Sequence, residues 1–409
     1  MSGEIDTLPR LAIFHSETSA PIFELVEAAQ GLCRIVWIVG WAQDGPPSRV
    51  LARFGEVVDL AGLNLRESIE RVVAVHPDGV AVFNDPPLVF AAQVARQLEL
   101  PFHSPETAHL LTDKFSQRQA LERAGLPVPR YAAIDSSSAH SSIAFPAVLK
   151  PRTGAGSRDV FRVENSTDVT DALEKCAPGE AFILEEWLAD RGSKPSLAAD
   201  VVSVESVVHE EEMEHVMVTG RFPFAPPLRE VGSFMPSDLN SADWHAATSL
   251  AGDAARALGI TFGIVHTEIK MTPVGPRLVE VNGRLGGEIS GLITRLGGPS
   301  MIAWSMRASL GLQLDGFPDL LQGRVAFFRL VVAPPNAPVF RSVRGVAELK
   351  REPGVSDVVV KLKPNDVVEV QKGYGGYALK IDGVAESLEE LAKLQDRIER
   401  TLTVTWDKV

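Results

Sequence analysis

The stretch FGIVHTEIKMTPVGPRLVEVNGRLGGE, residues 262–288, predicts two strands joined by a short turn. If this hairpin is centred on Val274, Glu268 lies opposite Glu280 and His266 lies opposite Asn282. Because side chains alternate along a strand, one face carries the polar residues His266, Glu268, Lys270, Glu280, Asn282 and Arg284. The other face carries the apolar residues Val265, Ile269, Val279 and Val281.

Two carboxylates that face each other across paired strands repel one another unless a cation compensates their charge. Oxygen ligands from Glu268, Glu280 and Asn282, without cysteine, select a hard divalent ion such as magnesium. We predict that Glu280 bridges two ions and that Glu268 and Asn282 each complete one. The alternative is a solvated strand face on which Lys270 and Arg284 neutralise the carboxylates.

A second candidate element is the glycine-rich turn that follows the strand AVLK. Lys150 ends that strand, and Gly154 and Gly156 leave the backbone free to approach a phosphate. Thr153 and Ser157 add hydroxyl donors. The lysine precedes the glycines and the loop enters a strand, so this is neither a Walker motif nor a dinucleotide-binding fingerprint. An ordinary surface turn is the alternative.

Composition excludes several classes of partner. Lys and Arg total 40 and Asp and Glu total 53 in 409 residues, a net charge of −13, which argues against binding to nucleic acid or an anionic membrane. We find no apolar run near the roughly 20 residues that span a bilayer. Cys33 and Cys176 lack metal-ligand or disulfide spacing, so we expect a cytoplasmic protein.

The chain is long enough for several compact units that mix α/β and α+β structure. Strands alternate with helical patterns over residues 1–106, which predicts an open parallel α/β domain. A small lobe with the glycine-rich loop follows over 107–185, and a larger lobe with the carboxylate hairpin over 186–310. Residues 311–409 predict an antiparallel sheet with one closing helix.

The order of these elements resembles the ATP-grasp superfamily over about residues 107–310. It runs from TDKF through a helix, Gly125-Leu-Pro, VLKP with its loop and ILEEWL to the carboxylate hairpin. The resemblance implies that two lobes hold ATP between them. Lys114 and Lys150 then contact nucleotide phosphates, and residues 153–158 lie over them.

The same resemblance assigns the remaining nucleotide contacts. Glu185 of ILEEWL takes the adenine amino group, the Leu188 backbone takes the ring nitrogen, and Glu186 is a further nucleotide-binding residue. Many relatives place a ribose-binding glutamate where this chain has Val201. Asp200 and Glu205 are the candidates to replace it.

For the metal and substrate, the resemblance implies magnesium ligands at Glu268, Glu280 and Asn282, with two ions and with manganese as a substitute. The expected catalytic residues are Arg284, Lys150 and Glu280, of which Arg284 steadies the acyl phosphate. The expected substrate contacts are the backbone of Gly286 and Gly287, the side chain of Glu288, and Asn84 and Asp85 after the strand GVAVF. Glu288 recognises an ammonium group or, alternatively, only starts a helix.

Within the superfamily, HTEIK and EVNGRLGGE resemble the carbamoyl-phosphate-synthase-like branch, and especially the L-amino-acid ligases. The function implied is ATP-dependent joining of a small-molecule carboxylate to an amine through an acyl phosphate. Homodimers are common among such relatives. Two alternatives stay open: a carboxylase that uses bicarbonate, and a nucleotide-binding regulatory module without turnover.

Overall fold

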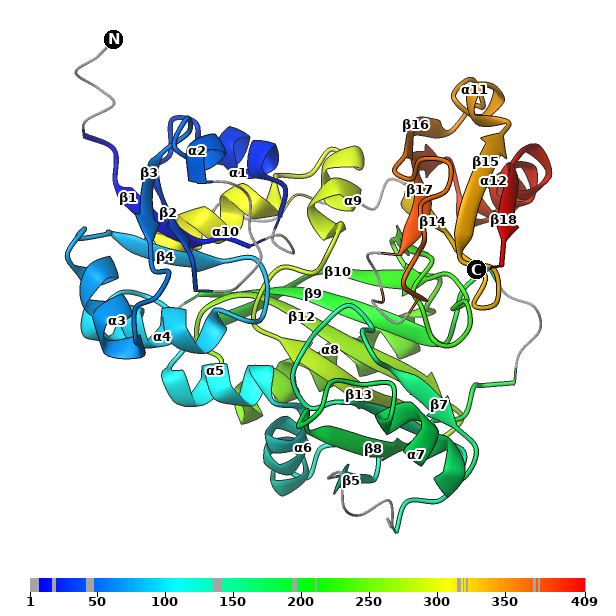
Figure 1. The fold of residues 1–409 in the computed structure, drawn as a ribbon, viewed down its shortest axis with the longest axis horizontal. Coiled ribbons are helices and arrows are strands. Elements are labelled where there is room, and N and C mark those ends of the chain that lie inside the picture. The colour runs from blue at the N-terminus through cyan, green and yellow to red at the C-terminus, as the bar shows by residue number, and fades with distance from the viewer. Residues whose placement is uncertain are drawn as a thin grey trace.

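The computed structural model describes residues 7–16, 20–41, 48–134, 142–192, 197–209, 212–314, 318, 320, 323–370, 373 and 376–408. Its N-terminal unit is the expected parallel sheet, with strand order β3-β2-β1-β4 and helices on both faces (Figure 1). The elements are β1 (Arg10–Phe14), α1 (Ile22–Ala29), β2 (Arg34–Val39), α2 (Ser48–Leu51), β3 (Glu56–Asp59), α3 (Leu65–Val73), β4 (Gly79–Val82) and α4 (Leu88–Gln97). The strand order reverses between β1 and β4, so their carboxyl ends border a crevice of the kind that binds ligands in such sheets.

The small lobe is a four-stranded antiparallel sheet with the order β5-β8-β6-β7. Two helices lead into it, α5 (Pro105–Thr112) and α6 (Lys114–Arg123), followed by β5 (Tyr131–Ile134), β6 (Ala147–Pro151), β7 (Phe161–Val163), α7 (Ser166–Leu173) and β8 (Phe182–Glu186). Asp113 separates the two helices, and its carboxylate accepts a hydrogen bond from the Ser116 backbone. Such an N-cap fixes where α6 begins, and therefore where Lys114 lies.

A single eight-stranded sheet joins the large lobe to the C-terminal residues, with the order β13-β12-β9-β10-β11-β14-β17-β16. The large lobe contains β9 (Val201–His209), β10 (Glu212–Arg221), β11 (Gly232–Met235), α8 (Ser241–Ala257), β12 (Gly263–Thr272), β13 (Gly275–Asn282), α9 (Ile289–Arg295) and α10 (Met301–Ser309). The remainder contains β14 (Val325–Val332), β15 (Val339–Arg344), α11 (Val346–Leu349), β16 (Val355–Val360), β17 (Tyr377–Ala385), α12 (Leu388–Thr401) and β18 (Thr403–Asp407). The expected C-terminal antiparallel strands are present, and most of them extend the sheet of the large lobe.

Two buried clusters hold the N-terminal sheet against the large lobe. In the first, side chains of β4 and α4 share a core with α8 and β12. In the second, β1 and β2 share a core with α9 and α10. Helix α10 therefore packs on the N-terminal sheet although it follows the carboxylate hairpin of β12 and β13 in sequence (Figure 1). This packing brings the carboxyl ends of β1 and β4 toward the loop that follows β13.

The helices in the described part of the chain give no candidate for a membrane span, since none combines sufficient length with sufficient apolar character.

Candidate active site

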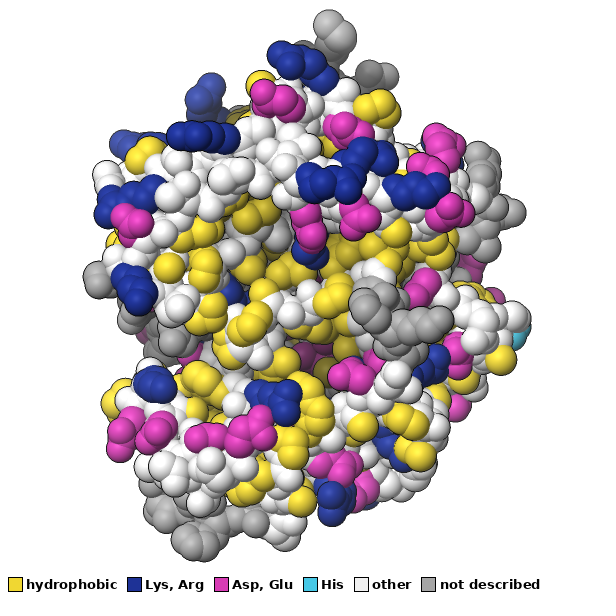
Figure 2. Space-filling model, turned by 90° about the vertical axis from the view of Figure 1, so that its right-hand side faces the viewer, with side chains coloured by type: hydrophobic (Ala, Val, Ile, Leu, Met, Phe, Trp, Pro, Cys, Tyr) yellow, Lys and Arg dark blue, Asp and Glu magenta, His cyan; other side chains and the backbone are white. Residues whose placement is uncertain are grey.

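A cleft of about 890 Å³ lies between the small lobe and the large sheet. Its walls include Lys114, Lys150, Thr153, Gly154, Gly156, Ser157, Glu185, Glu186, Leu188, Glu268 and Glu280. In the space-filling view, this face of the molecule is hollowed between its upper and lower halves, and hydrophobic side chains gather on the walls of the hollow (Figure 2). The structure thus brings the predicted nucleotide residues other than Glu205, and two of the predicted metal ligands, into one cavity.

The hairpin of β12 and β13 has the predicted register at its functional end. Glu268 pairs with Glu280, and His266 pairs with Asn282. The turn, however, is centred between Pro273 and Val274, because Thr272 pairs with Gly275. A β-bulge next to Glu268 supplies the extra residue that restores the predicted register.

The bulge also corrects one prediction about the apolar face. Val279 was expected to pack with Val265 and Ile269 on the core side, but it lines the cleft. Leu278 takes its place in the core and is fully buried. One inserted residue reverses the direction of its neighbour's side chain, because strand side chains alternate.

Helix α6 holds the exposed edge of β13 in place. The Gln117 side chain donates to the Val281 carbonyl at 2.9 Å and accepts from the Val281 backbone N–H at 2.9 Å. The Arg118 guanidinium donates to the Val279 carbonyl in the bulge. These contacts place Lys114 at the start of the same helix beside β13, where its Nζ lies 2.9 Å from the Glu280 Oε1.

Glu268, Glu280 and Asn282 form the predicted metal face, and each of its two carboxylates has a cationic partner in this structure. Lys114 pairs with Glu280, and Arg221 pairs with Glu268 at 2.8 Å. Among the described residues, no group of three His, Cys, Asp or Glu side chains could hold a metal on its own. Two carboxylates and the Asn282 amide on one face nevertheless fit a hard ion that takes its remaining ligands from phosphate and water. The residues present therefore fit magnesium.

Glu205 and His266 form a buried pair beside Glu268. Glu205 is fully buried, and its carboxylate lies 2.9 Å from the His266 Nδ1. Although burial lowers the pKa of His266, Glu205 and Glu268 raise it to about 9. Glu205 does not line the cleft, so the structure does not place it where a ribose would bind. Asp200, the other ribose candidate, does line the cleft.

Lys150, the second predicted phosphate lysine, pairs with a carboxylate of the small lobe. Lys150 lies 2.8 Å from Glu185, whose other carboxylate oxygen lies 2.8 Å from the Arg118 Nε. Burial lowers the pKa of Lys150 and opposes the effect of Glu185. Burial also raises the pKa of Glu185, but Arg118 and Lys150 bring it below its usual value. Glu185 is thus paired within the protein, and its predicted contact with adenine stays a prediction.

Glu186 and Leu188, the predicted nucleotide residues that follow Glu185, line the cleft. Glu186 accepts hydrogen bonds from the backbone and the side chain of Arg130, at 2.9 and 2.7 Å. Leu188 follows the end of β8 and lines the same cavity. Both positions are compatible with nucleotide contacts through their backbone.

The glycine-rich loop is held by contacts from two directions. The Lys114 Nζ donates to the Gly154 carbonyl at 2.6 Å. From the C-terminal part of the chain, Gly373 packs against the backbone of Gly156 and Arg158 with a φ of 68°. A side chain at Gly373 would overlap the Gly156 carbonyl and lie 2.8 Å from the Arg158 nitrogen. The C-terminal residues therefore help to set the position of this loop.

We expect Gly373→Ala to raise the KM for ATP by about three- to tenfold, because the loop must move or the backbone must strain by about 1 kcal/mol or more. Gly62→Ala is the matched control: Gly62 has a φ of 77° with no atom near its added side chain. Steady-state kinetics of both variants checks the prediction. Equal effects from the two substitutions would show that strain alone, without loop contact, is responsible.

The predicted substrate residues meet at the crevice of the N-terminal sheet. The Arg284 guanidinium forms two hydrogen bonds with Asp85, at 2.9 and 2.6 Å, and its Nη2 lies 3.4 Å from the Asn282 Oδ1. The Asn84 amide donates to the Ser16 hydroxyl at 2.6 Å. Asp85 thus orients Arg284, while Asn84 bridges the ends of β4 and β1.

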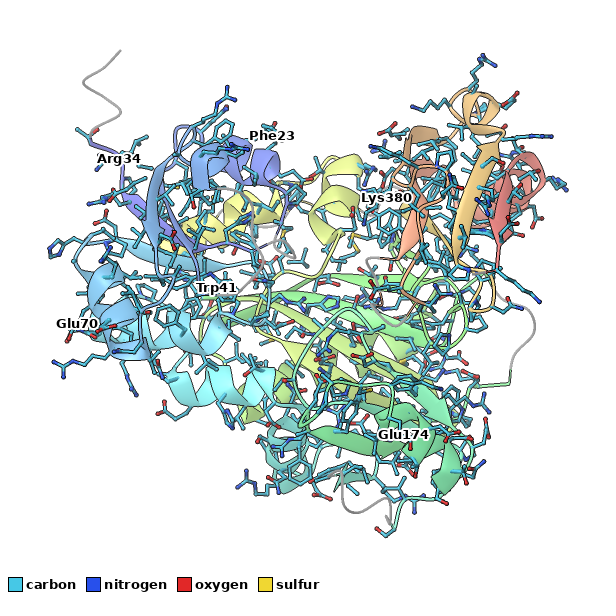
Figure 3. The ribbon with its side chains drawn as sticks, viewed as in Figure 1. Phe23, Arg34, Trp41, Glu70, Glu174 and Lys380 are labelled. Atoms are coloured by element: carbon cyan, nitrogen blue, oxygen red, sulfur yellow. The ribbon has the colours of Figure 1, made fainter. Side chains whose placement is uncertain are left out.

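The loop Gly286-Gly287-Glu288 leads into α9. A side chain at Gly286 would collide with His266, so this backbone lies directly against the buried imidazole. Glu288 is the N-cap of α9, with a φ of 63° and no capping hydrogen bond from its side chain. Its carboxylate instead lies 2.7 Å from the Lys380 Nζ of β17, between β17 and α9 (Figure 3). The sequence suggested that Glu288 binds the ammonium group of a substrate. In this structure the Glu288 carboxylate is paired with the ammonium group of Lys380.

Sequence patterns missed four polar residues of this site: Gln117, Arg118, Arg221 and Glu230. The two in α6 face inward on an otherwise charged helix. Arg221 and Glu230 lie on either side of a proline-rich turn and form an ion pair at 2.5 Å. In the sequence, Arg221 stands out only as an arginine at the end of an apolar strand. That signal does not identify Glu230 as its partner.

Comparisons with known proteins agree with this geometry. A family described as ATP-grasp domain matches residues 111–288. An uncharacterized protein of Sinorhizobium fredii is 27% identical over 66% of this chain and 56% of its own length. Carnosine synthase 1 of Gallus gallus is 26% identical over 63% of this chain but only 29% of its own length. The solved L-amino acid ligase of Bacillus licheniformis superposes over 98% of this chain and 99% of its own, with a TM-score of 0.79 at 18% identity, which shows the shared fold.

Proposed function

Since residues 111–288 carry an ATP-grasp domain, we propose that this chain is an ATP-dependent ligase that joins a carboxylate to an amine through an acyl phosphate. One observation carries the proposal above the others: Lys114, at the start of α6, reaches both the glycine-rich loop and Glu280 of the metal face. A triphosphate between these groups meets positive charge, backbone and metal ligands together. That combination suits phosphoryl transfer.

ATP lies in the 890 Å³ cleft in this proposal. Lys114 and Lys150 contact its phosphates, the loop from Thr153 to Ser157 covers them, and the backbone around Leu188 contacts the base. Asp200 is the candidate for the ribose. Magnesium, held by Glu268, Glu280 and Asn282, supplies charge neutralisation of the phosphate oxygens when bound.

In the first step, an oxygen of the substrate carboxylate attacks the γ-phosphorus, the bond to the bridging oxygen breaks, and ADP leaves. Lys150 and Arg284 disperse the charge of the transferring group. In the second step, the amine nitrogen attacks the acyl carbon, phosphate departs and the amine loses a proton. The Gly286-Gly287 backbone faces the oxyanion that forms. No side-chain nucleophile is required.

We further propose that the substrates are amino acids or a related acid and amine. Support comes from two similar proteins, a carnosine synthase and an L-amino acid ligase, and from the acidic residues near Arg284. Asn84 and Asp85 border the substrate crevice. Glu288 is the candidate contact for a substrate ammonium group, which would displace the Lys380 ammonium from its carboxylate. Two free cysteines, Cys33 and Cys176, are consistent with a reducing cytoplasm.

The decisive experiment is a phosphate-release screen over pairs of amino acids and simple amines with magnesium ATP, followed by product mass. We expect one or more pairs to give ADP, phosphate and a product that has lost one water. Stimulation by bicarbonate alone would assign the chain to carboxylation instead. Absence of ADP with every pair and with bicarbonate would favour a regulatory module.

A further inference from the structure

We propose that Arg221 binds the carboxylate substrate, and that the turn which follows it selects an acid with an apolar body next to the carboxylate. This inference rests on the proposed ligase function and names the substrate class of that same site. It concerns the part of the cleft beyond the metal ligands, which is lined by Arg221, Pro223, Phe224, Leu228 and Glu230.

Arg221 is a buried cation whose hydrogen-bonding capacity is only partly used. Its side chain is 7% exposed and still borders the cleft. The two terminal nitrogens pair with Glu230 at 2.5 Å and Glu268 at 2.8 Å. Its Nε has no hydrogen-bond partner among the described residues. A buried donor left without a partner costs about 1–3 kcal/mol, so a site that retains one is suited to receive an acceptor from a ligand.

The charges around Arg221 also favour an incoming anion. Arg221, at the end of β10, and Arg284, in the loop after β13, both interact electrostatically with Glu268. A divalent ion bound at Glu268 would neutralise that carboxylate, which would leave Arg221 with Glu230 and Glu205 as its counter-charges. A carboxylate beside Glu268 would meet the two guanidinium groups. One of them is Arg284, which the ligase proposal already assigns to the transferring group.

The turn between β10 and β11 supplies the apolar wall. Phe224 and Leu228 are half-buried and line the cleft, and an isolated bridge between Ala225 and Arg229 closes the turn. The Arg229 side chain donates to the carbonyls of Pro226 and Ala333, at 3.0 and 2.5 Å, which fixes the turn to the C-terminal strands. An acid held at Arg221 would therefore rest its body on a preformed apolar surface.

The test uses the full chain with MgADP and measures binding of 4-methylpentanoate, 4-methylpentanamide and acetate by calorimetry. We expect the wild type to bind 4-methylpentanoate at least tenfold more tightly than either the amide or acetate. Arg221→Lys and Arg221→Met should each weaken binding of 4-methylpentanoate by about 10- to 100-fold, because a charge-assisted hydrogen bond is lost. MgADP affinity should stay within threefold and serves as the check on folding.

Arg397→Lys is the matched control, since Arg397 also pairs with a carboxylate, Glu352 at 2.6 Å, but lies in α12 and does not line the cleft. It should change 4-methylpentanoate binding by less than twofold. The inference is wrong if the wild type does not prefer 4-methylpentanoate, if the Arg221 variants retain its affinity, or if Arg397→Lys weakens it equally. These failures are distinct from failure of the ligase proposal, which the phosphate-release screen reports on the wild type alone.

Discussion

Glu280→Gln is expected to lower ADP formation by about a thousandfold or more, because it removes a negative charge from the face that should hold the divalent ions. Glu280 lies opposite Glu268 and 2.9 Å from Lys114, so it joins the predicted metal face to α6, the helix that begins with Lys114. Glutamine has nearly the same shape but is a poor ligand for a hard cation. The measurement is ADP release with the best substrate pair at saturating magnesium ATP.

Glu174→Gln is the control for that experiment, since Glu174 lies at the end of α7 on the surface of the small lobe (Figure 3). It should leave ADP release unchanged. The fold of Glu280→Gln should persist, because Lys114 keeps its hydrogen bond to the Gly154 carbonyl. Full turnover by Glu280→Gln would contradict the metal assignment.

Arg284→Lys is expected to lower kcat by about 100- to 1,000-fold while changing the KM for ATP by less than threefold. The two hydrogen bonds between Arg284 and Asp85 fix the plane of the guanidinium group. Lysine keeps the charge but cannot make a planar, two-point contact. The loss should therefore appear in the chemical step and hardly in nucleotide binding. Separate measurements of kcat and KM test this.

Asp85→Asn provides the companion measurement. An amide can accept only one of the two guanidinium hydrogen bonds, so we expect a smaller loss in kcat than for Arg284→Lys. If both variants instead raise the KM for ATP with little change in kcat, Arg284 belongs to the nucleotide site and its assignment to the acyl phosphate is wrong.

The pairing of Glu268 with Glu280 could be predicted because a strand has a strict two-residue period and the hairpin is local. The bulge at Val279 could not, because it depends on Arg118 and Gln117 of α6, which bind the carbonyls of β13 from more than 160 residues away. The parallel N-terminal sheet could be predicted for the same local reason, since apolar strands alternate there with amphipathic helices. The structure confirms it.

Contacts between residues that lie far apart in sequence could not be predicted. Nothing near Arg284 indicates Asp85, which is 199 residues away, and nothing near Glu288 indicates Lys380. Glu205 is a further example. The resemblance made it a candidate to replace the ribose-binding glutamate that many relatives have at the position of Val201, but the packing of β9 beside β12 places its carboxylate against His266.

The continuity of the eight-stranded sheet has a consequence for shortened forms of the chain. A protein that ended at residue 310 would lose β14 and leave the outer edge of β11 without its hydrogen-bonding neighbour. Phe234 and Met235 on that strand are fully buried in the intact chain. An open edge flanked by such side chains is a template for strand addition by other molecules. The C-terminal residues thus protect the two lobes around the cleft from aggregation, quite apart from any part that they play at the cleft itself.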